Sequence, residues 1–426
     1  MSKSIYIFIL TMLTTQFLDI RPFSEWMAER NGLDGLIFVI LWMVFGVFHY
    51  HHRSEHDLCS YSTVKPYFWI MAGIFLSMIP AFLYFNQSFV QSLMTYRIQY
   101  FWLMLPLLLY IRPEIENIVR PLNLFSFLFV ITAFIRTRIA PEWFLFSDTV
   151  LERLTYTDYY ANELVHGSGI LLLLIPLYYY VSDLREEMTT RNITYVSLYL
   201  VAFLILQNRS TLFIVVLVII YAIVVNRSVN HFSLLLLALI GGMGFYYFTI
   251  DTWNALFNET IENLNDKDYN RVMGFYYFIY EANTHLLTYV LGNGYLSAHS
   301  TSHMQDFMEK GIYNADLGFI GYWNQFGLIP IIVFVTYIIK AMRSRLCPFY
   351  VKAIGFHIIA CSITLSYFSF LHNILWFSLF YYLYVYHTED PEFDEEYEDE
   401  EDYEEEEEYY EEYVENELYD VPQLKV

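Results

Sequence analysis

The sequence predicts an all-α membrane protein, a polytopic bundle of about twelve transmembrane helices. Three observations predict it. The 426 residues are 56% hydrophobic and 20% aromatic, more apolar than soluble domains of this size usually are. The apolar residues form long continuous runs rather than alternating ones, which favours spanning helices over a barrel. Tyrosines gather at the ends of these runs, where aromatic rings suit the two membrane interfaces.

The apolar runs give the expected spans in order. They lie at approximately 4–20, 34–50, 67–85, 96–111, 121–139, 165–182, 192–207, 211–226, 231–249, 314–340, 353–370 and 373–388. The runs 96–111 and 373–388 are short, because a helical span needs about 17–25 residues. Lys3 precedes the first run and no small-residue cleavage site follows it, so we interpret this run as a retained span.

Lysine and arginine near the span ends favour a cytoplasmic N-terminus. This excess becomes clear once the two long connections 140–164 and 250–313 are set aside. The prediction places both termini in the cytoplasm and makes 250–313 a large periplasmic loop within a membrane domain of residues 1–388. A loop of this length between two spans is usually functional.

The C-terminal segment 389–426 differs in composition from the rest of the chain. Glu389–Asp420 holds 21 of the 46 acidic residues, so the membrane domain is nearly neutral despite a net charge of -23. A block of like charges repels itself and cannot build a core, which predicts a disordered cytoplasmic tail. Either a solvated tail or docking onto a basic cytosolic partner fits this composition.

Arg209 lies in the hairpin QNRST between two apolar runs, with Asn208 and Ser210 beside it. An arginine so close to the hydrocarbon is costly unless it snorkels or pairs. A guanidinium matches phosphate oxygens with two parallel hydrogen bonds, and the neighbouring amide and hydroxyl add donors. The alternatives are an interface arginine and a phosphate-binding group.

The segment 269–329 carries the remaining candidate residues. Arg271 opens an amphipathic stretch that could lie along the outer membrane face, or it could pair with a nearby acid. His299 and His303 are four residues apart, a spacing that suits a general base better than a metal site, since no clear third ligand accompanies them. Asp316 precedes the next span and is either a helix cap or a catalytic acid or base.

Several site classes have no motif in the sequence. There is no phosphate-binding loop, dinucleotide fingerprint, nucleophile elbow or paired-cysteine zinc site, and the three cysteines are scattered. Nucleotide hydrolysis and soluble redox chemistry are therefore unsupported. We expect no cofactor, no metal ion and no nucleic-acid partner.

Four segments resemble the bacterial O-antigen polymerases and the related O-antigen ligases, which are membrane glycosyltransferases. They are ANELVHGSGILLLLIPLYYY at 161–180, QNRSTLFIVVLVII at 207–220, YNRVMGFYYFIY with VLGNGY at 269–295, and NADLGFIGYWNQFGLIP at 314–330. The resemblance covers roughly residues 120–385, and the order and spacing of the motifs carry it. The acidic tail is not part of the family pattern.

The resemblance implies transfer of a glycan from undecaprenyl pyrophosphate to an acceptor glycan at the periplasmic face of the inner membrane. Arg209 and Arg271 would bind the pyrophosphate, and His299, His303 or Asp316 would activate the acceptor hydroxyl. The resemblance favours a polymerase of repeat units and leaves room for a chain-length regulator as partner. A ligase that delivers finished glycan and a flippase of another class are the alternatives, although a flippase should carry charges near the membrane midplane.

Overall fold

The structure of the protein is a computed structural model, and the expected all-α class is confirmed in the part of the chain that it describes. Its described residues are 2–20, 33–51, 60–140, 143–144, 169–206, 209–225, 270–296, 317–362 and 370–388. Within these ranges the chain is helical and forms no strand, apart from one isolated bridge between Ile20 and Phe144.

The helices follow one another with short connections. In the N-terminal half they are α1 (Lys3–Thr14), α3 (Leu33–His49), α4 (Tyr61–Leu76), α5 (Met78–Phe85), α6 (Phe89–Thr95), η2 (Tyr96–Leu103), α7 (Met104–Ile111) and α8 (Ile115–Arg138). Then come η5 (Ile170–Leu173), α10 (Leu174–Glu186), α11 (Thr190–Leu206), α12 (Arg209–Val225), α14 (Asn270–Tyr276), the π-helical η6 (Tyr277–Glu281), α15 (Leu286–Leu291), α17 (Gly318–Phe326), α18 (Leu328–Arg343), α19 (Phe349–Cys361) and α20 (Leu371–Thr388).

Two of these helices are long and apolar enough to cross a membrane, Tyr61–Phe85 and Ile115–Arg138. Several other predicted spans are shorter or broken in the structure, so the bundle of twelve spans is not confirmed. The first one ends at Thr14, because the residues Gln16 to Asp19 have positive φ. The predicted span 314–340 is two helices that meet at Gly327. The run 231–249 lies outside the described residues.

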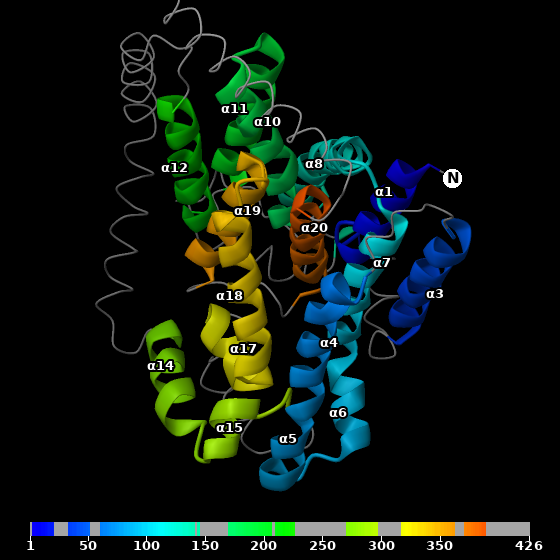
Figure 1. The fold of residues 1–426 in the computed structure, drawn as a ribbon, viewed down its shortest axis with the longest axis vertical. Helices are drawn as coiled ribbons and strands as arrows, with labels where there is room; N and C mark the ends of the chain where they lie inside the picture. Colours follow the sequence, from blue (N-terminus) through cyan, green and yellow to red (C-terminus); the bar gives the residue numbers. More distant parts are fainter. Residues whose placement is uncertain are drawn as a thin grey trace, which may run out of the picture.

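The last helix, α20, forms the centre of the bundle (Figure 1). Nearly all of its side chains are buried, and it packs against α7, η2, α1, α19 and η5. Its tyrosines tie distant connections together: Tyr381 donates to Thr63 O at 2.8 Å, and Tyr382 donates to Pro113 O at 2.6 Å. Buried aromatic rings dominate such cores because each removes a large apolar area from water.

One end of the bundle carries many cationic side chains, and we call it the basic end, defined by Lys3, Arg112, Arg185 and Lys352. Lys3 Nζ donates to Arg112 O at 2.7 Å, which joins the start of α1 to the link between α7 and α8. His387 in the last turn of α20 contacts Tyr350 in the first turn of α19, with Nε2 and the hydroxyl oxygen 2.6 Å apart. These contacts bring four helix ends to one level.

The opposite end, called the loop end, is defined by Tyr84, His285 and Tyr295. The apolar rod Tyr61–Phe85 starts at the basic end, and its 25 residues carry the chain about 37 Å away. There the rings of Tyr84 and His285 stack with centroids 4.0 Å apart. Figure 1 shows α5 and α15 together at the lower edge of the view, where they contact each other. Part of the predicted loop 250–313 therefore lies opposite Lys3.

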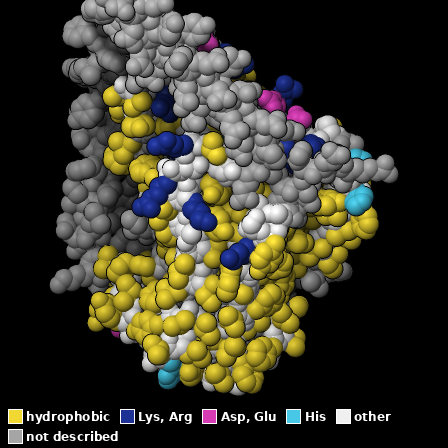
Figure 2. Space-filling view, viewed as in Figure 1, with side chains coloured by type: hydrophobic (Ala, Val, Ile, Leu, Met, Phe, Trp, Pro, Cys, Tyr) yellow, Lys and Arg dark blue, Asp and Glu magenta, His cyan; other side chains and the backbone are white. Residues whose placement is uncertain are grey.

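Large apolar side chains cover much of the outer surface of the described helices. On α12 they include Phe213 (66% exposed) and Val224 (62%), and on α3 they include Leu41 (60%) and Phe48 (79%). Figure 2 shows an almost continuous apolar surface over the lower part of one face, with Lys and Arg side chains gathered above it. Soluble monomers rarely expose apolar patches on this scale.

Candidate functional site

A backbone crossing at the loop end joins two segments that sequence analysis singled out. Gly292 and Gly327 both have φ of +78°. A Cβ atom on Gly292 would lie 2.6 Å from Gln325 O and from Gly327 N, so only glycine fits there. Asn293 N donates to Asn324 O at 2.6 Å, and Gly294 N donates to Gln325 O at 2.9 Å. The Gly-x-Gly turn is therefore fixed against the end of α17.

Four buried amide side chains surround this crossing, namely Asn283, Asn293, Asn324 and Gln325. Asn293 Nδ2 donates to Asn283 Oδ1 at 3.3 Å and to Ala282 O at 3.2 Å. Within the described residues, Asn293 Oδ1 and Gln325 Oε1 accept no hydrogen bond. Buried acceptors without donors are costly and rare, so these two oxygens mark the crossing as a place where a further donor would bind favourably.

The helix η2 supports the same turn from the other side. Tyr96 is fully buried, and its hydroxyl oxygen lies 2.8 Å from Ser77 Oγ and accepts from Tyr295 N at 3.1 Å. The carbonyl of Tyr295 accepts from Gln87 Nε2 and from Thr95 Oγ1, each at 3.1 Å. These bonds connect residues some two hundred positions apart and hold the turn 292–296 in one position.

Arg97 is a cationic residue at this place that sequence analysis did not select. It follows Tyr96 on η2 and is half-buried, and the described residues include no acidic partner for it. Burial raises the pKa of Tyr295, and the positive charge of Arg97 nearby lowers it. A signal was present in the sequence, because Arg97 and Gln99 interrupt an otherwise apolar run at a predicted membrane edge.

The structure describes only part of the predicted site. Arg209 is the first residue of α12, with Ser210 second, and Arg271 is the second residue of α14. Their helical positions are defined, whereas their side chains are not described. The other candidates, Asn208, His299, His303 and Asp316, lie outside the described residues.

Helix packing places the start of α12 close in level to the start of α17. The helices α12 and α19 pack antiparallel, with Tyr221 near the end of α12 stacked on Phe349 at the start of α19, 5.8 Å between centroids. The first turn of α12 therefore lies level with the last turn of α19. Phe319 N in α17 donates to Ser362 O at 2.8 Å, directly after α19. Arg209 and the closing segment thus share one region of the bundle.

The helix that carries Arg271 is anchored to the same region. Phe278 in η6 is fully buried and packs with Leu317, and Met273 packs against this pair. Met273 is two residues beyond Arg271, and Leu317 directly follows Asp316 in the sequence. The starts of α14 and α17 therefore lie close together. No protein-family model matches the chain, and no curated protein matches it.

Proposed function

We propose that this protein is a multi-pass glycosyltransferase of the bacterial inner membrane. It polymerises repeat units linked to undecaprenyl pyrophosphate into O-antigen, capsular or exopolysaccharide at the periplasmic face. The observation that carries the proposal is the packing of three segments on which the resemblance rests. The start of α12, the stretch from α14 to Gly294, and the segment around α17 lie together in the folded chain.

The exposed apolar surface supports a membrane location. The rod Tyr61–Phe85 and the helix Ile115–Arg138 are long enough to span alone, and the exposed apolar faces of α3 and α12 extend the same surface. In the proposed arrangement the broken and short helices also lie within the bilayer, giving about twelve spans. Broken helices are tolerated at membrane depth where they are buried in protein or line a cavity, and the break at Gly327 is such a place.

The proposed reaction is a displacement at the anomeric carbon of the donor sugar. An acceptor hydroxyl oxygen forms the new bond, the bond from that carbon to the pyrophosphate oxygen breaks, and the pyrophosphate leaves with the electron pair. His299, His303 or Asp316 takes the hydroxyl proton. Arg209 and Arg271 neutralise the leaving group with fixed positive charge, which is effective where water is scarce.

The experiment that tests this function is the analysis of lipid-linked glycan in a strain that lacks the protein. Single repeat units on surface acceptors, without a ladder of longer products, are expected for a polymerase. Long polymer that remains on undecaprenyl pyrophosphate would identify a ligase instead. Single units held on the cytoplasmic leaflet would identify a flippase and would overturn the proposed chemistry.

Substitution of the two arginines tests the proposed roles within the reaction. Arg209→Ala and Arg271→Ala should each reduce long-chain glycan by about 100-fold or more at an unchanged protein level, because each removes a preorganised charge. Arg185→Ala, at the basic end, is the matched control and should leave the ladder intact. Full activity of both loop-end variants would refute the pyrophosphate-binding role.

A further inference from the structure

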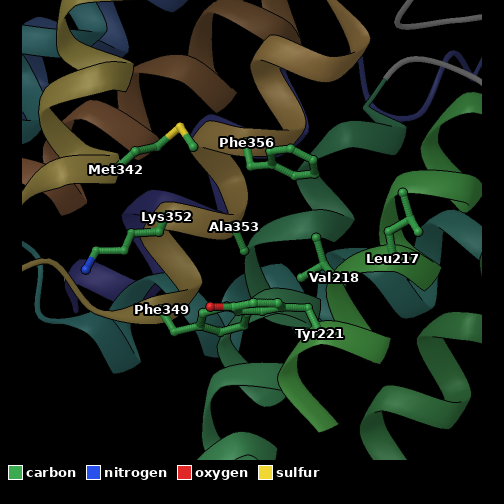
Figure 3. A pocket seen from close by; sticks show the side chains of 8 residues that line it. All are labelled: Leu217, Val218, Tyr221, Met342, Phe349, Lys352, Ala353 and Phe356. Carbon is green, nitrogen blue, oxygen red and sulfur yellow. The ribbon is translucent and has the colours of Figure 1, made fainter. Parts of the chain in front are cut away.

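A groove at the basic end lies far from the proposed reaction site. It has a volume of about 380 Å³ and lies between α12, the end of α18 and the start of α19. Its lining is apolar apart from one cation, as Figure 3 shows; the lining residues are Leu217, Val218, Tyr221, Met342, Phe349, Lys352, Ala353 and Phe356. The groove is open to the outside, since Tyr221 is 56% and Phe356 39% exposed.

The groove changes character along its length. At the rim, the rings of Tyr221 and Phe349 stack at 5.8 Å, and Arg185 places its guanidinium carbon 5.2 Å from the centre of the Phe349 ring. Lys352 extends its amine away from the apolar wall in Figure 3. Farther along, Leu217 and Phe356 provide only hydrocarbon. A cationic rim that leads into an apolar channel matches an amphiphile with an anionic head.

The two rim cations are available to an outside anion. The described acid nearest in sequence to Arg185 is Asp183, whose carboxylate pairs with Arg191 at 3.6 Å. Within the described residues neither Arg185 nor Lys352 forms an ion pair. Burial raises the pKa of Asp183, while Arg191 lowers it, so this carboxylate is already engaged. The charge at the rim is therefore positive.

We propose that this groove binds one acidic phospholipid of the cytoplasmic leaflet. The phosphate lies between Arg185 and Lys352, and an acyl chain lies along Leu217, Val218 and Phe356. Basic pockets between helices on the cytoplasmic side are suited to anionic headgroups, and each buried methylene of the chain adds favourable transfer free energy. The proposal rests on the membrane location and orientation proposed above and is independent of the glycan reaction.

Counting bound lipid by native mass spectrometry tests the proposal. The full chain, purified in a neutral detergent, is titrated with phosphatidylglycerol or with phosphatidylcholine of identical acyl chains. We expect one tightly held phosphatidylglycerol and weaker binding of phosphatidylcholine. Lys352→Gln should weaken phosphatidylglycerol binding about fivefold and leave phosphatidylcholine binding unchanged, because only a headgroup charge contact is lost. Thermal unfolding without added lipid verifies that the variant is folded.

Lys340→Gln is the matched control, because Lys340 lies at the same end but contacts the Tyr337 ring and does not line the groove. It should bind both lipids as the wild type does. Equal binding of the two lipids by the wild type would overturn the proposal. Phosphatidylglycerol binding that appears only after deletion of 389–426 would also overturn it, since the acidic tail would then be the occupant. A chain that does not fractionate with membranes would refute the membrane location as well.

Discussion

Replacement of Gly292 by alanine should destabilise the loop end strongly. Gly292 has φ +78° and ψ 175°, a backbone region that is nearly restricted to glycine and costs other residues about 1–3 kcal/mol. The added Cβ would also lie 2.6 Å from Gln325 O and Gly327 N. Both are backbone atoms that cannot rotate away, and forced overpacking costs about another 1–3 kcal/mol. The expected total is about 2–6 kcal/mol, a large share of the stability of an ordinary domain.

Denaturant or thermal unfolding of the purified chain in detergent measures this loss. Gly355→Ala is the matched control, because Gly355 is helical and its new Cβ would lie 3.3 Å from side-chain atoms of Ile338 and Phe380. Its helix propensity gain of about 0.5–1 kcal/mol should roughly offset that close contact. Gly292→Ala should also abolish long glycan, because the crossing holds α15 against α17. Equal stability of the two variants would refute the structure of the crossing.

Three further perturbations test other parts of the molecule. Arg136→Ala should destabilise the chain by about 3–5 kcal/mol in the same unfolding assay, because it breaks the buried pair with Asp19 at 3.3 Å, whereas the exposed Arg138→Ala should be nearly neutral. Arg97→Gln should lower the yield of long glycan at least about tenfold, the loss of one charge-assisted contact, without a change in melting temperature. Deletion of 389–426 should leave the glycan ladder on a gel unchanged, and a lost ladder would contradict a solvated tail.

Composition and hydropathy predicted the helical class and several helix bounds well. The run 96–111 corresponds to η2 and α7 together, and the run 34–50 corresponds to α3. The break at Gly327 was not predicted, because hydropathy is continuous across it and the cause is tertiary. The backbone of Val290 and Leu291 approaches Gly327 so closely that no side chain fits there. Local sequence carries no record of a contact between segments almost forty residues apart.

The candidate site shows the same division. Sequence motifs selected the segments around Arg209, Arg271 and Asp316, and helix packing places these segments in one region. Sequence analysis missed the role of η2, whose Gln99 accepts from Tyr322 OH at 3.0 Å across 223 positions. A buried hydrogen bond of that range leaves only a polar residue within an apolar run as its trace. Spacing rules do not extend to such partners.

The central position of α20 has a consequence for synthesis of the chain. The helix that fills the core between α1 and α7 is made last, after those helices have already left the ribosome. At about 5–20 residues per second, the first helices wait roughly 20–70 s for it. Until then Tyr381 and Tyr382 are absent, and the connections at Thr63 and Pro113 lack these donors. Chains released before residue 371 should therefore remain open assemblies that quality-control proteases remove.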